Sequence, residues 1–474
     1  MKTRIPSLAL AVSLLAGGLV SCGGGSGNAE TAVQTVATAE AVTTEAVTEY
    51  KPPEYDFQGY TFRFLNGNTS YKPFELCVEE LTGESLNDAI YNRNKATETR
   101  YNITLAETIS KSPQADFSNG VIAGDDSFDV ATLRMEWAMP VTFQGQTLPW
   151  NDIGTLHLDS SYWVQGSLKA FSFANKVYFA VSAFDITHYD SVRAFAFNKK
   201  ICSDLQMTSP YTLIREGKWT LDKLEDMSLA AAQDLDGDGE WTTADRYGII
   251  SYSNVIANTM MAGVGSILSI GKDKDDMPYF DLDTEKHVNS LMKVSAFFAD
   301  REKNGIIYRE NKQDIFRAGQ ALFMCSLINE VAALRDMDDD FGIISAPKLD
   351  EKQENYINLG GSPFFTTIPV TQKDTDRTGA ILDALAFDSV GVIDTAYYDI
   401  LLKGKTSRDE ESAEMLDLIF STLAYYHPVA NSYLNAPLAD QYLWYGKTDF
   451  ASYFASVKDK INAEIADAIS LAKK

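Results

Sequence analysis

The sequence predicts an α/β fold in which helices cover β-sheets. Short β-rich runs alternate with helical patterns early in the chain, as expected for a layered α/β architecture. Further β-rich runs recur in the middle, and the pattern after residue 376 is almost entirely helical. No internal repeat of about 20–50 residues is visible, which argues against a repeat architecture.

Each predicted element has its own residue pattern. Residues 60–65 (YTFRFL) alternate polar and aromatic side chains, which predicts a strand. Residues 85–101 predict a helix, with Ser85 as its cap and Leu86 and Ile90 on its inner face. Further strands are predicted at 102–107, 128–133, 176–183, 192–198, 247–253, 321–325, 341–346 and 364–370, with a helix at 220–232 and helices through most of 376–474.

Composition limits the class of protein. The 474 residues are 45% hydrophobic, 11% aromatic and 23% charged, which excludes wholesale disorder and suits two to four domains or one or two large ones. The net charge is −25, from 41 basic and 66 acidic residues, so the surface repels nucleic acid and anionic lipid. The four histidines are scattered and no GxSxG motif is present, which argues against a zinc enzyme and a triad hydrolase.

The N-terminus is typical of an exported lipoprotein. Lys2 and Arg4 precede an apolar stretch that is too short to span a bilayer and ends in Leu19-Val20-Ser21-Cys22. This ending resembles a bacterial lipobox, so residues 1–21 are the expected signal peptide and Cys22 the acylated (palmitate-type) first residue. The alternative is an ordinary secretory signal. Cleavage before Cys22 removes two basic residues and no acid, which changes the net charge from −25 to −27.

The segment after Cys22 is expected to be a flexible linker over 22–54. It is rich in Gly, Ser, Ala, Thr, Val and Glu and has no aromatic residue before Tyr50. No later segment reaches transmembrane length, so the lipid on Cys22 would be the only membrane contact. The other cysteines, Cys77, Cys202 and Cys325, lie in apolar contexts and are expected to be free thiols.

A twelve-residue acidic segment has the spacing of a calcium-binding loop. Oxygen donors fall at positions 1, 3, 5, 9 and 12, Gly239 stands at position 6, and position 7 would give its backbone carbonyl. A strand-like pattern follows the loop, so a paired EF-hand sensor is not expected. The alternatives are a structural Ca²⁺ site and an acidic surface turn. The candidate ligands are Asp234, Asp236, Asp238, Glu240, Thr242 and Asp245.

Several segments together resemble bacterial extracellular solute-binding proteins of ABC importers, the family-1, carbohydrate-type branch. Besides the lipobox and linker, they are GESLNDAIY (83–91), GKWTLDKL (217–224), AGQALF (318–323), DFGII (340–344), PK (347–348) and SRDEESAEML (407–416). None of these segments is a catalytic signature. Their order and spacing over residues 55–425 carry the resemblance.

The resemblance implies a two-lobed, type II periplasmic-binding-protein-like fold. Chain crossings are then expected near 183–192, 316–325 and 362–368. The N-terminal lobe would comprise 55–185 and 325–362, and the C-terminal lobe 190–316 and 368–474. Such lobes close by hinge motion around a ligand, which binds at the carboxyl ends of the strands.

The resemblance also implies a ligand site of aromatic faces and polar groups in loops after strands. For each aromatic residue a core role is as compatible with the sequence as ligand contact. Arg134 could be a ligand clamp or half of an ion pair, and Trp137 is the preferred contact because it follows a strand end. The candidates are Asn66, Asn68, Tyr71, Arg134, Trp137, Asp185, Tyr189, Ser362, Phe364, Tyr252 and Trp444, with Glu136, His188 and Asn254 beside them.

Two functions from different classes follow. The first is a monomeric, lipid-anchored receptor on the extracytoplasmic face of the cell membrane, which binds a carbohydrate, in particular an oligosaccharide, and delivers it to a permease. The alternative is a surface glycoside-active enzyme with paired carboxylates. No motif places two carboxylates at facing strand ends, so we expect a receptor with no catalytic residues. A calcium-dependent adhesion protein is disfavoured because the loop occurs once.

Overall fold

The computed structural model describes residues 51–67, 76–266, 270–301, 303–308, 312–334, 336–402, 410–429, 434 and 436–473. Contacts divide the chain into two units, Met1–Glu49 and Tyr50–Lys474, and all described residues belong to the second. The expected signal peptide, Cys22 and most of the expected linker therefore lie outside the described residues.

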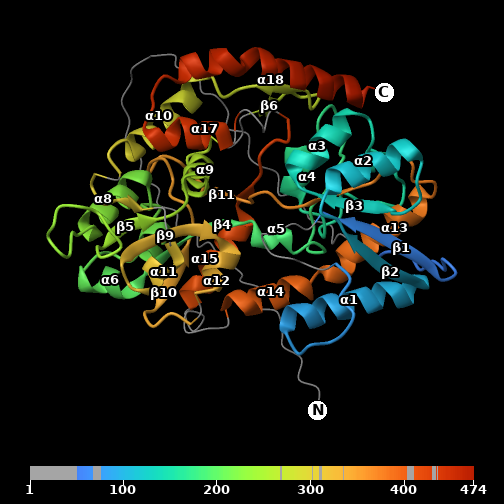
Figure 1. The fold of residues 1–474 in the computed structure, drawn as a ribbon, viewed down its shortest axis with the longest axis horizontal. Helices are drawn as coiled ribbons and strands as arrows, with labels where there is room; N and C mark the ends of the chain where they lie inside the picture. The colour runs from blue at the N-terminus through green and yellow to red at the C-terminus, as the bar shows by residue number, and fades with distance from the viewer. Residues whose placement is uncertain are drawn as a thin grey trace, which may run out of the picture. The chain divides into compact units, whose positions relative to one another are not determined.

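The first sheet has four strands in the order β12-β3-β1-β2. Figure 1 labels β1, β2 and β3 of this sheet. β1 pairs in parallel with both β2 and β3, and β12 pairs with β3 in the antiparallel direction. Phe62, Phe64 and Val130 are buried on these strands, as the β-branched and aromatic patterns predict. The strands are β1 (Tyr60–Asn66), β2 (Ile103–Ile109), β3 (Val130–Leu133) and β12 (Phe365–Thr367).

The second sheet has five strands in the order β10-β4-β9-β5-β8. β4 runs antiparallel to both of its neighbours, whereas β5 pairs in parallel with β8 and β9. The strands are β4 (Arg193–Asn198), β5 (Tyr247–Ile250), β8 (Ile307–Tyr308), β9 (Ala321–Leu327) and β10 (Phe341–Ile344). Two further pairs are β6 (Ile270–Lys272) with β7 (Pro278–Phe280) and β11 (Asn358–Leu359) with β13 (Leu423–Ala424).

Helices surround both sheets. α13 and α14 each pack on α1, which contacts β2 of the first sheet, and α8, α9 and α11 contact strands of the second. The earlier helices are α1 (Ser85–Tyr101), α2 (Pro113–Ala123), α3 (Met135–Phe143), η1 (Trp150–Asp152), α4 (Gln165–Phe171), α5 (Thr187–Asp190), α6 (Lys199–Asp204), α7 (Pro210–Arg215), α8 (Leu221–Ala231), α9 (Ser253–Gly263) and α10 (Glu285–Ala299). The later ones are α11 (Lys312–Arg317), α12 (Ile328–Ala332), α13 (Thr375–Ser389), α14 (Ile393–Leu402), α15 (Glu410–Ser421), α17 (Ala436–Gln441), η3 (Leu443–Tyr445) and α18 (Phe450–Ala472).

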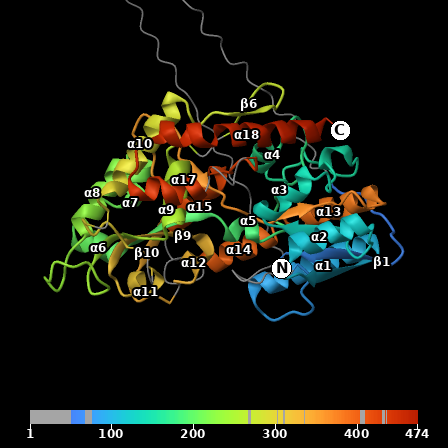
Figure 2. The ribbon, with the colours of Figure 1, turned by 45° about the horizontal axis from the view of Figure 1, so that its top comes forward.

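The last helix, α18, contacts β7 and α3. Its first half packs on β7, where the rings of Phe454 and Phe280 are 5.6 Å apart, and Lys458 pairs with Asp283. Its last turn reaches the neighbourhood of α3, where a Cβ on Gly145 would lie 3.9 Å from Leu471. Figures 1 and 2 both show α18 running from beside α10 towards α3. Among the described residues, no helix is both long and apolar enough to cross a membrane.

Most predicted elements are confirmed, with two corrections. Helix 85–101 has the expected bounds, but Glu84 is its N-cap and Ser85 its first helical residue. Residues 176–183 are not a strand: their backbone forms only isolated bridges, and Phe179 and Val181 are buried in the core. The aromatic and β-branched side chains of this segment resemble those of a strand, but here most of them are buried in the core from an irregular backbone. Cys202 and Cys325 are buried free thiols and Cys77 is half-buried.

Strand pairing divides the chain differently from the expected lobe boundaries. The expected N-terminal lobe included 325–362, but β10 within it pairs with β4 of the second sheet. The expected C-terminal lobe included 368–474, but α13 packs on α1 beside the first sheet. No crossing occurs at 316–325, because β8 and β9 both belong to the second sheet. The chain returns to the first sheet between β10 and β12, and α15 then packs again on β10.

Candidate functional site

The carboxyl ends of three parallel strands meet at one edge of the first sheet. β1, β2 and β3 end there at Asn66, Ile109 and Leu133, and β12 begins at the same edge because it runs antiparallel. The loops that leave parallel strands at this edge form the usual ligand-binding crevice of open α/β sheets. This edge is therefore a candidate for a ligand-binding site.

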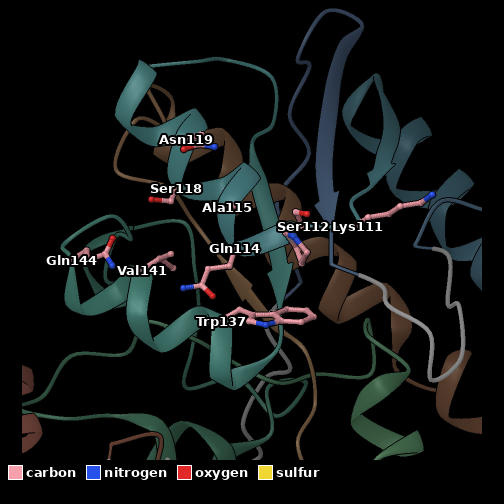
Figure 3. Close-up of a pocket in the computed structure, with 10 residues that line it drawn as sticks. Lys111, Ser112, Gln114, Ala115, Ser118, Asn119, Trp137, Val141 and Gln144 are labelled. Atoms are coloured by element: carbon pink, nitrogen blue, oxygen red, sulfur yellow. The ribbon is translucent and has the colours of Figure 1, made fainter.

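A cavity of about 480 Å³ lies at this edge, between the start of α2 and α3. Figure 3 shows Gln114 extending from α2 towards the ring of Trp137, whereas the side chain of Lys111 points away from the others. An aromatic ring and several side-chain amides and hydroxyls are thus presented to one space, which suits a polar ligand with apolar faces. The lining residues are Lys111, Ser112, Pro113, Gln114, Ala115, Ser118, Asn119, Trp137, Val141 and Gln144.

Trp137 is half-buried at the wall of this cavity. Its ring meets that of Phe364 edge-on, with centroids 6.4 Å apart, and the guanidinium of Arg134 lies 5.6 Å from its centroid. Arg134 also donates to Glu136, with Nε 2.9 Å from Oε1. Arg134 thus forms an ion pair, which is one of the two roles expected for it. Arg134, Trp137 and Phe364 form one cluster. Their contact with a ligand stays a prediction.

A chain of hydrogen bonds connects the two crossing segments behind this cluster. The backbone N–H of Phe364 donates to Thr187 Oγ1 (2.9 Å), and that hydroxyl donates to Asp185 Oδ1 (2.7 Å). Asp185 is 5% exposed, and its Oδ2 is buried with no hydrogen-bond partner among the described residues. Burial raises the pKa of Asp185 to about 7, although the hydrogen bonds from Thr187 act in the opposite direction. The described contacts of Asp185 lie within the crossing segments, and its contact with a ligand stays a prediction.

Four predicted site residues do not offer a free side chain to a ligand. Asn66 is fully buried and bonded to Glu107 and Thr132. Tyr189 is buried and stacks on Tyr397, with ring centroids 4.8 Å apart. Trp444 is 2% exposed and packs against Phe298 and Arg301. His188, also buried, shares a hydrogen bond with Tyr425.

Other predicted residues are placed more openly. Ser362 and Phe364 are half-buried before β12. Tyr252 is 48% exposed just after β5, at the carboxyl edge of the second sheet, with Asn254 two residues on. Lys312 lies beneath Tyr252, with Nζ 4.1 Å from the ring centroid, and is held by Ser326 and Glu330. Asn68 and Tyr71 lie outside the described residues.

The sequence patterns did not single out the polar residues of α2, or Gln144 at the end of α3, as site residues. The signal that could have found them is Ser112-Pro113, because proline at the first helical position is a common helix start. That helix begins directly after β2 and so places Gln114, Ser118 and Asn119 at the carboxyl edge.

The predicted calcium loop is a closed turn between α8 and β5. Gln233 and Arg246 exchange backbone hydrogen bonds of 2.8 and 3.0 Å at its base. Carboxylate oxygens of Asp234, Asp236 and Asp245 lie within 4.8 Å of one another. The backbone N–H of Asp238 lowers the pKa of Asp236, but burial and the neighbouring carboxylates outweigh it and raise the pKa overall. Three converging oxygens with mutual repulsion fit a hard cation such as Ca²⁺.

Comparison with known proteins identifies solved structures that have a similar fold. No family model matches the sequence, and no curated protein matches it. Among solved structures, an ABC substrate-binding protein from Listeria monocytogenes in complex with cycloalternan has a TM-score of 0.54 at 13% identity, covering 86% of this chain and 99% of its own. A cyclo/maltodextrin-binding protein complexed with maltotetraose has a TM-score of 0.53 at 14% identity, covering 90% and 98%. UgpB from Mycobacterium tuberculosis, in complex with glycerophosphocholine, has a TM-score of 0.53 at 12% identity, covering 87% and 99%.

These likenesses cover nearly the whole of each solved chain. They show that the chain has the two-lobed periplasmic-binding-protein-like fold that the sequence predicts. The two sheets, with the chain passing between them more than once, agree with that architecture.

Proposed function

We propose that this protein is an extracytoplasmic solute-binding receptor of an ABC importer. It captures a carbohydrate, in particular an oligosaccharide, between two lobes and delivers it to a membrane permease. The fold supports this proposal, since solved proteins of the same fold hold cycloalternan and maltotetraose. The permease and its ATPase would be separate chains, and the receptor would act as a monomer.

The cavity at the carboxyl edge of the first sheet is the observation that carries the proposal. A sugar ring has an apolar face of C–H groups that packs on an aromatic ring, and hydroxyl groups that need donors and acceptors. Trp137 supplies the ring, and Gln114, Asn119 and Gln144 supply amides on the same space. Amides both donate and accept, so they match hydroxyl groups in either role.

The alternative, a glycoside-active enzyme, has less support. Glycoside hydrolysis uses two carboxyl groups on either side of the bond that is cleaved. In the described part of the chain, none of the residues that line the cavity is Asp or Glu. The function proposed is therefore binding without a chemical step.

Two further proposals concern the attachment and stability of the receptor. The lipobox sequence supports acylation of Cys22 and a location at the cell membrane, on its extracytoplasmic face. The loop geometry supports a structural Ca²⁺ ion held by Asp234, Asp236 and Asp245, with Asp238, Glu240 and Thr242 completing the predicted ligand set. When bound, the ion would neutralise the repulsion among these carboxylates.

A thermal-shift screen of the purified protein against mono- and oligosaccharides tests the proposal. A sugar that binds the folded state raises the unfolding midpoint by mass action and is recovered intact. Products of hydrolysis, lost on substitution of a single carboxylate, would instead support the enzyme. No shift with any sugar would remove the carbohydrate assignment.

A further inference from the structure

The carboxyl edge of the second sheet holds an arginine whose hydrogen-bonding capacity is largely unused. Arg193 is the first residue of β4, directly after the crossing segment that contains α5 (Figure 1). The side chain is half-buried, and its Nε is buried with no hydrogen-bond partner among the described residues. Nη1 of Arg193 donates to the carbonyl of Asn254 at 3.3 Å, and Asn258 donates to the same carbonyl at 2.8 Å.

Arg193 also differs from most arginines of the described chain in its charge environment. Arg63, Arg100, Arg215 and Arg317 each form an ion pair with Asp or Glu. No such pair involves Arg193 within the described residues. The carboxylate of Asp440 acts on it only at longer range and is itself bonded to Ser253 Oγ at 2.9 Å. In a chain with 66 acidic residues, a half-buried guanidinium without a carboxylate partner is a candidate for a functional charge.

Two neighbours make this position suitable for a ligand. Tyr252, two residues before Asn254, exposes 48% of its surface, and buried Lys312 fixes its ring from below. Tyr252 is also the N-cap of the 11-residue helix α9, and its side chain makes no capping bond. The positive end of the α9 dipole therefore adds to the charge of Arg193.

We propose that Arg193 and Tyr252 form a subsite for an anionic group carried by the carbohydrate ligand. The Nη1 and Nη2 end of the guanidinium carries the N–H donors that would meet two oxygens of a carboxylate or a phosphate, since Nε is buried. The ligand class is thus a uronic-acid-containing oligosaccharide or a sugar phosphate, with a sugar ring against Tyr252. This inference rests on the proposed receptor function and narrows its substrate.

The first test needs no ligand. Thermal unfolding is measured for the protein, for Arg193→Met and for the control Arg317→Met. The control removes the same charge from the last residue of α11, where it forms an ion pair with Asp336. Because Arg193 has one shared hydrogen bond, the Arg193→Met variant is expected to unfold at the same temperature as the parent or above it. A midpoint several degrees below that of Arg317→Met would make Arg193 a structural residue and overturn the proposal.

The second test uses digalacturonate, glucose 6-phosphate and neutral maltotetraose as probes in calorimetric titrations. One of the two anionic probes is expected to bind, about tenfold or more weaker to Arg193→Met, with a smaller loss for Arg193→Lys and none for Arg317→Met. Digalacturonate identifies a carboxylate ligand and glucose 6-phosphate a phosphate ligand. If only maltotetraose binds, the receptor stands and the anionic subsite is wrong. If none of the three binds, the anionic subsite is wrong, whereas the receptor function is decided by the wider thermal-shift screen.

Discussion

The ring of Trp137 meets the ring of Phe364 edge-on, with centroids 6.4 Å apart. Trp137 lies on the helix that follows β3, and Phe364 lies on the segment that returns from the second sheet to β12. This contact links the wall of the cavity directly to a chain crossing. A ligand that packs on Trp137 would therefore also act on the segment that joins the two sheets.

Replacing Trp137 with alanine should weaken binding of the sugar that gives the largest shift in the thermal-shift screen. Losing the ring removes its packing on the sugar, and we expect a loss of about 1–3 kcal/mol, or about 5- to 150-fold in Kd. Calorimetric titration measures the change, and Trp137→Phe, which keeps a ring, should retain most of the affinity. Equal affinity of Trp137→Ala and the parent would remove Trp137 from the site.

Gly361→Ala should destabilise the fold more than Gly391→Ala. Both glycines have positive φ, +68° and +71°. A Cβ on Gly361 would lie 1.9 Å from the carbonyl oxygen of Ser191, whereas no atom of the described residues lies within 4 Å of one on Gly391. Gly391→Ala therefore reports the backbone strain alone, about 1 kcal/mol, and Gly361→Ala adds a clash between two crossing segments, for a total of about 3 kcal/mol.

Urea unfolding of the two glycine variants separates the two costs. Similar losses would mean that the crossing segments can move apart, and the tight contact between residues 191 and 361 would then not constrain the fold.

Asp185→Asn should stabilise the protein at pH 8 and have little effect at pH 4. Burial raises the pKa of Asp185 to about 7 in the folded protein, above the usual value of about 4 for an unfolded chain. Between these two values the folded state binds more protons, so stability falls as pH rises from about 4 to 7 and stays low above that. Asparagine keeps the acceptor for Thr187 and carries no charge.

Chemical denaturation from pH 4 to pH 8 checks this prediction, with Glu80→Gln as the exposed control. A parent-minus-variant difference that does not change with pH would show that the Asp185 carboxyl titrates normally.

Removing calcium with a chelator should lower the unfolding midpoint of the parent protein, and adding Ca²⁺ should restore it. Asp236→Ala should abolish this response, because it removes one of the three converging carboxylates. Asp226→Ala, on α8 just before the loop, is the matched control and should respond to Ca²⁺ as the parent does. Melting curves that are the same with and without chelator would leave the loop as an acidic turn.

Much of the fold could be predicted because local patterns and tertiary packing agree. Helix 85–101 was found from its apolar spacing, and β4 from its run of buried small and aromatic residues. Residues 176–183 could not be distinguished from a strand, because aromatic side chains fill a core equally well from an irregular segment.

The site was harder to predict than the fold. Position after a strand end correctly placed Trp137 at a cavity, but it also selected Asn66 and Tyr189, whose side chains are buried. Trp444 shows the same ambiguity, since its burial depends on residues far away in sequence, Phe298 and Arg301. Which sheet β10 and α13 join depends on contacts between residues far apart in sequence, and local pattern carries no information on such contacts.

The C-terminal helix limits how far the two regions that it contacts can move apart. α18 has 23 residues, so it is a rod of about 35 Å whose interior hydrogen bonds resist bending. One end is held at β7 and the other near Gly145. A stiff helix held at both ends permits rotation about these ends but little change in the distance between them. A movement of β7 relative to α3 would therefore be a rotation about the ends of α18 rather than a separation of the two.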